Sequence, residues 1–190
     1  QILDLDIEII KVASCSATDR PLLNRVAQTN RPVVVSTAGL GILEFDRLVS
    51  TLESENVNFA LMHCIALYPT PPDKLKLTHI NMFRERFPSI PVGFSTHEDP
   101  NNYNAIRIAV AKGAQLFERH VGIQTKKHTL NKYSSTPPQI AKWIRAYKET
   151  VASCGGQFFS PAYPEEITSL YSLMRGVYAK KDQAQSVYAG

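Results

Sequence analysis

Short apolar runs alternate with longer amphipathic segments along most of the 190-residue chain. The runs are rich in β-branched residues and show little polar alternation, which is typical of strands covered on both faces of a parallel sheet. They lie at residues 7–14, 32–38, 58–66, 90–97 and 115–123. Each run is followed by apolar residues at helical spacing, so the pattern predicts five β-α units joined by right-handed crossovers.

The predicted helices carry ordinary start and stop signals. Asp19 can cap the first helix, with Pro21 in its first turn. The last helix has an apolar stripe from Ile140 to Val151 and should stop at Gly155. Serial β-α units form either an open doubly wound sheet or part of a (β/α)8 barrel. No Gly-x-Gly-x-x-Gly follows the first strand, which disfavours the dinucleotide-binding open sheet.

Polar residues gather where the predicted strands end. They are Lys11, Ser14, Ser36, Thr37, His63, Ser95, His97, Glu118 and His120. In parallel α/β folds this edge of the sheet is where sites are assembled. Ser95 and His97 are two residues apart, as are Glu118 and His120, so each pair shares one face of its strand. If the last two strands are neighbours, His97 and His120 can converge on one metal ion.

Each of these residues also has a structural interpretation. A histidine at a strand end is often only hydrogen-bonded, Lys11 can be a solvated lysine, and Ser36 with Thr37 can cap the next helix. His63 lies inside an apolar strand, which favours packing. The histidine pattern alone leaves the metal site and the structural interpretation equally open. One ammonium group with several hydroxyls around one opening suits a phosphate or carboxylate ligand.

Composition narrows the class of partner. The formal net charge is +4, but lysines and arginines are scattered and form no basic cluster with aromatic residues, so nucleic acid is not expected as a partner. The three cysteines form no Cys-x-x-Cys motif, which fits a reducing compartment and predicts a cytoplasmic protein. No apolar run approaches the roughly 20 residues that cross a bilayer, so no membrane partner is expected.

Five motifs together resemble the sialic acid synthase (N-acetylneuraminate synthase) family over about residues 7–150. They are KVAS (11–14), PVVVSTAG (32–39), LMHCIALYPTPP (61–72), PVGFSTH (91–97) and FERH (117–120). The resemblance implies a (β/α)8 TIM barrel that condenses phosphoenolpyruvate with an N-acyl amino sugar. It also implies a divalent metal, Mn²⁺ or Mg²⁺, nonulosonic acid products such as sialic acid, and a homodimeric full-length protein.

The resemblance also assigns roles to residues of this sequence. His97 and His120 match the metal ligands, and Glu118 matches the acid of the family's Glu-Lys-His run. Lys11 and Glu118 are accordingly expected to be catalytic. The positions that hold phosphoenolpyruvate in the family are matched by Lys11, Ser14, Ser36, Tyr68 and Ser95.

Several positions depart from the family pattern. Ser16 stands where the family has a glutamate, Ala66 replaces an asparagine, Thr96 replaces an aspartate, and Leu130-Asn131 replace an Asp-His pair. These changes leave a second hypothesis open, in which the barrel is catalytically degenerate and acts as a metabolite sensor or interaction scaffold.

The resemblance also predicts the domain organisation. The five strands correspond to strands 4–8 of the family barrel, so we expect a fragment of a longer chain that is inactive in isolation. Residues 1–157 are predicted to form the partial barrel and residues 158–190 a linker toward an absent C-terminal domain. The linker prediction rests on RGVYAKKD (175–182), which is similar to the stretch that follows the family barrel.

Overall fold

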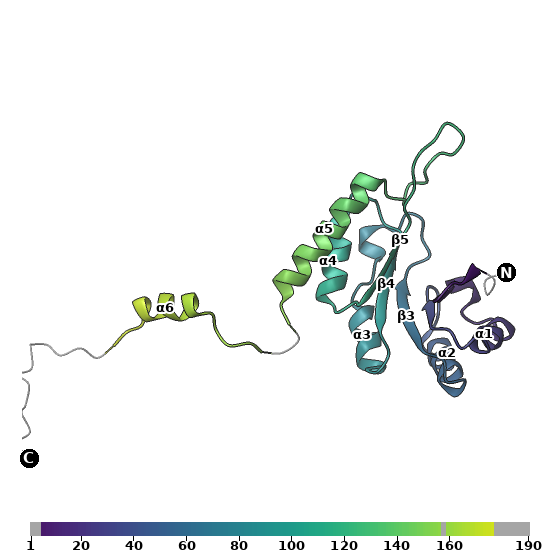
Figure 1. Ribbon diagram of the computed structural model, residues 1–190, viewed down its shortest axis with the longest axis horizontal. Helices are drawn as coiled ribbons and strands as arrows, with labels where there is room; N and C mark the ends of the chain where they lie inside the picture. The colour runs from purple at the N-terminus through teal and green to yellow at the C-terminus, as the bar shows by residue number, and fades with distance from the viewer. Residues whose placement is uncertain (1–4, 157–158, 177–190) are drawn as a thin grey trace, which may run out of the picture. The chain divides into compact units, whose positions relative to one another are not determined.

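The computed structural model describes residues 5–156 and 159–176, and its chain divides into two compact units, residues 1–155 and 156–190. The first unit contains one sheet of five parallel strands in the order β1-β2-β3-β4-β5 (Figure 1). The strands are β1 (Ile10–Val12), β2 (Val33–Ser36), β3 (Phe59–Cys64), β4 (Val92–Thr96) and β5 (Leu116–Arg119). The prediction of five parallel β-α units is therefore confirmed.

A helix follows each strand, and two short 3₁₀ turns, η2 (Ser14–Ser16) and η3 (Pro72–Lys74), lie within two of the connections. The Asp19 side chain accepts a hydrogen bond from the Leu22 N–H at 3.1 Å, as the first-turn pattern predicted. Gly155 ends the last helix of the sheet unit with φ +67°, a conformation that glycine adopts without strain. The helices are α1 (Arg20–Ala27), α2 (Ile42–Ser54), α3 (His79–Arg86), α4 (Tyr103–Ala111) and α5 (Pro137–Cys154).

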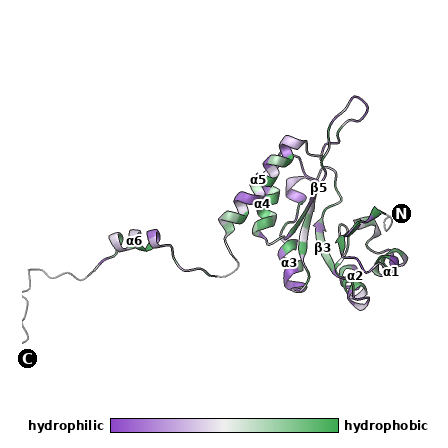
Figure 2. Cartoon of the chain, in the orientation of Figure 1, coloured by the Kyte–Doolittle hydropathy of each residue, from purple (hydrophilic) through white to green (hydrophobic). Residues whose placement is uncertain are grey.

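The main core lies between the sheet and its helices. All six residues of β3 are buried, and Figure 2 shows hydrophobic colour over most of this strand. Phe45 of α2 and Phe83 of α3 stack with ring centroids 4.2 Å apart in this core. His63 points into the same layer, where its Nε2 lies 2.8 Å from the Leu75 carbonyl oxygen. The packing interpretation of His63 is therefore confirmed.

The sheet is strongly curled. Lys11 Nζ lies 2.7 Å from Glu118 Oε2, although these residues belong to the first and last strands. In a flat sheet, four strand spacings would separate these strands by about 19 Å, which the two side chains cannot span. The five strands therefore form a partial barrel, and Lys11 and Glu118 meet on its concave side.

Close strand approach at the centre of this sheet depends on Gly93. A Cβ atom at this position would lie 2.6 Å from the Leu116 carbonyl oxygen and 2.9 Å from the Leu116 Cβ. Both atoms belong to the neighbouring strand β5, which cannot move without breaking its pairing with β4. Glycine is required here because any side chain would separate the two strands that carry the histidines.

The second unit contains α6 (Pro164–Leu173), a helix that the sequence analysis did not predict within the proposed linker. The predicted boundary at residue 157 and most of RGVYAKKD lie outside the described residues. Among the described residues, no helix is both long and apolar enough to cross a membrane.

Candidate functional site

One cavity, of about 450 Å³, gathers all the residues to which the family resemblance assigns a role, whereas Thr37 and His63 do not line it. It opens at the carboxyl ends of the strands, where β-α loops can add further groups. Strand register explains the convergence, because Cys64, Ser95 and Glu118 are paired across β3, β4 and β5 and share the concave face. The predicted residues that line the cavity are Lys11, Ser14, Ser36, Tyr68, Ser95, His97, Glu118 and His120.

One part of the cavity carries an ammonium group and hydroxyls. Ser36 and Ser95 are each only 3% exposed. Ser36 Oγ has no hydrogen-bond partner within the described part of the chain. A buried hydroxyl without a partner is costly, so a ligand oxygen that bonds to Ser36 would remove that cost. Lys11 beside these hydroxyls makes this part suitable for an anion.

Ser14 and Thr37 also have roles in holding the loops above the strands. Ser14 Oγ accepts a hydrogen bond from the Ala38 N–H at 3.0 Å, and this bond joins the β1 and β2 loops. Thr37 Oγ1 donates to the Met62 carbonyl at 3.0 Å. The structural alternative for Thr37 as a helix cap is therefore wrong, because α2 begins at Ile42 with Gly41 as its N-cap, and Thr37 bonds to β3 instead.

The two histidines meet at the other part of the cavity. The ring centroids of His97 and His120 are 5.2 Å apart. Two imidazoles bound to one ion with nitrogen–metal distances of about 2.1 Å have centroids roughly 4.6–5.3 Å apart when they occupy adjacent coordination positions. The pair therefore fits a single divalent ion. Among the described residues, no group of three or more His, Cys, Asp or Glu side chains is placed to hold an ion, so water and substrate oxygens would complete the coordination.

The surroundings of His97 favour its metal-binding form. Its Nδ1 lies 3.8 Å from Cys64 Sγ. With Nδ1 facing Cys64, Nε2 is the ring nitrogen that remains for an ion. Burial, followed by the neighbouring His120, lowers the pKa of His97, so the ring stays neutral at physiological pH. Burial also raises the pKa of Cys64, which keeps this group a thiol.

Two tyrosines complete the cavity around the histidines. The Tyr68 ring lies 4.6 Å from the His97 ring, and burial raises the pKa of its phenol. The Tyr133 ring lies 5.7 Å from His97 and 5.1 Å from His120. Tyr133 was not predicted from the sequence, because it lies in a long connection between β5 and α5 without hydrophobic periodicity. Its position three residues before the Thr136 cap of α5 was the one available signal.

The structure gives a location to each departure from the family pattern. Ala66 lines the cavity. Ser16 ends the short turn after β1, and Thr96 is 1% exposed and paired with Arg119 on the helix-covered side of the sheet. Asn131 Oδ1 accepts hydrogen bonds from the N–H groups of Tyr133 and Ser134, at 3.1 and 2.8 Å. Asn131 therefore shapes the turn that presents Tyr133.

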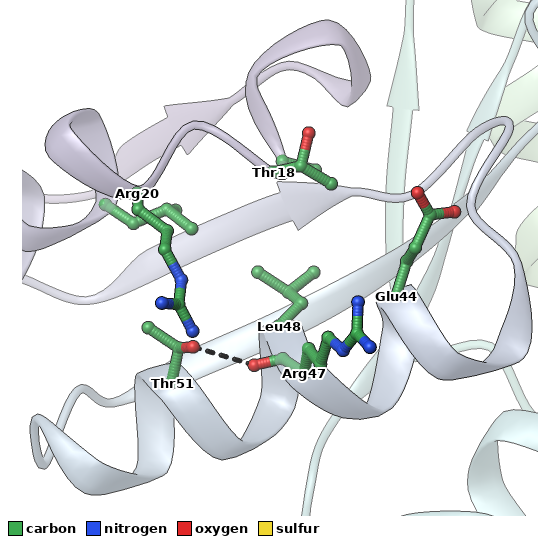
Figure 3. A pocket seen from close by; sticks show the side chains of 8 residues that line it. Thr18, Arg20, Glu44, Arg47, Leu48 and Thr51 are labelled. Carbon is green, nitrogen blue, oxygen red and sulfur yellow. Dashed lines mark hydrogen bonds between the residues drawn. The ribbon is translucent and has the colours of Figure 1, made fainter.

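A second hollow, of about 420 Å³, lies between α1 and α2 (Figure 3). Arg20 and Arg47 flank it, and Leu48 lies at its base. It contains none of the residues selected from the sequence and no histidine or cysteine. The cavity with the histidines is therefore the better candidate site.

Comparison with known proteins agrees with this geometry. The NeuB family model matches residues 1–158. The N-acetylneuraminate-9-phosphate synthase of Drosophila melanogaster is 35% identical over 73% of this chain and 37% of its own length. The spore coat polysaccharide biosynthesis protein SpsE of Bacillus subtilis is 32% identical over 88% of this chain and 45% of its own length.

A solved structure from Chromobacterium violaceum, assigned as spore coat polysaccharide biosynthesis protein E, superposes with a TM-score of 0.88 at 43% identity. The match covers 92% of this chain and 52% of that one. The chain thus spans about half the length of the solved relative, and less of the two curated ones. Sequence motifs, strand order and overall match agree, and the chain belongs to the NeuB family of sialic acid synthases.

Proposed function

We propose that the protein containing this chain condenses phosphoenolpyruvate with an N-acyl amino sugar to form a nonulosonic acid, in a metal-dependent reaction. The observation that carries the proposal is the single cavity in which an ammonium group, buried hydroxyls and two facing histidines meet. An anion and a metal-bound aldehyde could be held there side by side, which is the arrangement that a bimolecular condensation needs. The relatives named as synthases support the same class of reaction.

The residues of the chain would divide the work. Lys11, Ser14, Ser36, Tyr68 and Ser95 would bind the phosphate and carboxylate of phosphoenolpyruvate, with Lys11 balancing negative charge as phosphate leaves. Glu118, 2.7 Å from Lys11, would hold the ammonium group in place and accept or return a proton. Carbon C3 of phosphoenolpyruvate would attack the aldehyde carbon, water would add at C2, and phosphate would leave by C–O cleavage.

His97 and His120 would hold a divalent ion, Mn²⁺ or Mg²⁺. When bound, such an ion supplies Lewis-acid polarisation of the sugar aldehyde. The lowered pKa of His97 supports this role, because a neutral imidazole nitrogen is the form that binds metal. The substrates in this proposal are small molecules, and the full-length protein is proposed to be a cytoplasmic homodimer.

A second candidate is a degenerate barrel that senses a phosphorylated metabolite or acts as a scaffold. Ser16 favours it, because the family places a glutamate there and loss of one acid or base group typically slows a reaction by about 10²–10⁴-fold. Glu118 limits this argument, since it is a carboxylate within the same cavity.

Phosphate release from phosphoenolpyruvate separates the two candidates. The full-length protein is assayed with Mn²⁺ against a panel of N-acyl amino sugars, with His97→Ala as the matched inactive variant. Phosphate release that requires both the amino sugar and His97 supports the synthase function. Phosphoenolpyruvate binding without release, across the whole panel, supports the sensor.

A further inference from the structure

A buried ion pair lies directly behind the two histidines. Arg119 Nη1 lies 2.6 Å from Glu98 Oε1, and the two side chains are 1% and 0% exposed. Glu98 follows His97 in the chain, and Arg119 precedes His120. Arg119 follows Glu118 in β5 and therefore points to the opposite face of the sheet, and neither Glu98 nor Arg119 lines the cavity that holds the histidines.

Arg119 joins three segments of the chain. Its Nη2 donates to the Glu98 carbonyl oxygen at 3.2 Å, in addition to the side-chain pair. Its Nε donates to Ser135 Oγ at 2.5 Å. The guanidinium fork therefore holds the end of β4, the end of β5 and the residues just before α5 in one arrangement.

Backbone bonds carry this arrangement to the site. The Ser135 N–H donates to the His120 carbonyl at 2.9 Å, and the Gly122 N–H donates to the Ser135 carbonyl at 3.0 Å. Tyr133, two residues before Ser135, thereby reaches the space beside both histidine rings. Hydrogen bonds thus connect Arg119 to the segments that carry His97, His120 and Tyr133.

Stability alone does not account for such a pair. A buried ion pair costs desolvation of both charges and is often replaceable by apolar residues without loss of stability. Glu98 Oε2 also has no hydrogen-bond partner among the described residues, so desolvation of this carboxylate is incompletely offset. The pair instead fixes the relative orientation of the end of β4, the end of β5 and the residues before α5. It can do so because the planar guanidinium forms hydrogen bonds only over a narrow range of angles.

We propose that Glu98 and Arg119 are positioning residues that set the spacing of the His97–His120 pair and the place of Tyr133 beside it. The inference rests on the proposed metal-dependent function and deepens it. Glu98 and Arg119 lie outside the cavity, and the inference is that they align the side chains of His97, His120 and Tyr133 inside it.

The test measures Mn²⁺ affinity by electron paramagnetic resonance titration of the full chain, together with the thermal midpoint. Glu98→Gln keeps the shape of the side chain and removes its charge, and Arg119→Lys keeps the charge and removes the fork. Each is expected to weaken Mn²⁺ binding by about 10–100-fold, the range for residues that orient metal ligands. Asp46→Asn is the control, because it breaks the exposed Arg86–Asp46 pair of equal length, 2.6 Å, away from the site.

Lowered thermal midpoints with Mn²⁺ affinity within twofold of wild type in both variants would overturn the inference, since the pair would then be purely structural. A variant that does not fold is replaced by Ser135→Ala, which removes one of the contacts of Arg119. It should fold normally and still weaken Mn²⁺ binding measurably, and unchanged affinity would count against the inference.

A failure of the proposed function is recognised separately. If the wild-type protein binds no Mn²⁺, the metal role fails, while ring placement is still measured in the metal-free protein. Nuclear Overhauser contacts between the Tyr133 ring and the rings of His97 and His120 are expected in wild type and should be lost in Glu98→Gln. Their retention in that variant would refute the positioning role.

Discussion

Substitution of Lys11 and of Glu118 should have different effects on the affinity for phosphoenolpyruvate. The two substitutions should lower the free energy of unfolding by almost the same amount. Their side chains are 35% and 39% exposed, so the 2.7 Å ion pair lies in contact with solvent. Pairs of this kind contribute about 0.2–1 kcal/mol to the free energy of unfolding. Lys11→Met and Glu118→Gln should therefore each lower the unfolding free energy by no more than about 1 kcal/mol.

Binding of phosphoenolpyruvate should separate the two variants. A hydrogen bond between a charged donor and a charged ligand is worth about 1.5–3 kcal/mol, which corresponds to roughly 10–150-fold in affinity. Lys11→Met should weaken binding by such a factor. Glu118→Gln removes the negative charge 2.7 Å from the Lys11 ammonium, so the ligand anion no longer competes with it, and affinity should be unchanged or higher.

Isothermal titration calorimetry with phosphoenolpyruvate and urea denaturation measure these two quantities on the same samples. Asp46→Asn again serves as the control. The Arg86–Asp46 pair is exposed to a similar extent as the Lys11–Glu118 pair, and neither of its residues lines the cavity. The reasoning would be refuted if Lys11→Met bound phosphoenolpyruvate within threefold of wild type. It would also be refuted if Glu118→Gln weakened binding as much as Lys11→Met.

Three further predictions test separate parts of the account. Gly93→Ala should lower the free energy of unfolding by at least about 1–3 kcal/mol in urea denaturation, because its Cβ would meet the Leu116 carbonyl at 2.6 Å. Gly41→Ala, where the nearest atom is 3.5 Å away, should cost less, and equal losses would contradict the packing argument. Burial lowers the pKa of His63 below its ordinary 6.5, so the unfolded chain binds this proton more readily and stability should fall as pH drops through about 6.5. His63→Gln, which can still donate to the Leu75 carbonyl, should show a smaller loss between about pH 7 and pH 5, and an unchanged pH profile would exclude this origin. Tyr133→Ala should raise the KM for the amino sugar more than the KM for phosphoenolpyruvate, whereas Tyr133→Phe should leave both constants unchanged. Equal changes of both constants in Tyr133→Ala would argue against a position of Tyr133 beside the amino sugar.

The fold could be predicted from the sequence because its signals are local and repeated. Each apolar run was found in its place, and the caps at Asp19 and Gly155 mark helix ends as expected. Strand ends were less well predicted. The segment 115–123 gives a strand of four residues only, Leu116–Arg119, because Val121 leaves the sheet to bridge with Ser135. That bridge depends on a contact across the chain that no local pattern encodes.

The site was predictable to the extent that strand parity applies. His97, Glu118 and His120 share a face because of the period of two, and parallel neighbours then bring them together. The Lys11–Glu118 contact depends on the curl of the whole sheet, and the Glu98–Arg119 pair depends on how the loop after β4 lies against the last residue of β5. Tyr133 reaches the cavity from an irregular connection. Side chains placed by long-range geometry of this kind leave no periodic signal.

The central claim is that His97 and His120 bind one divalent ion beside an anion site. Anomalous diffraction from crystals of the full-length protein soaked with Mn²⁺ tests it directly. The account predicts one peak between the two rings, about 2.0–2.3 Å from a nitrogen of each, and no such peak in crystals of His120→Ala. A fully soaked wild-type crystal without density between the rings would contradict the account and return both histidines to a structural role.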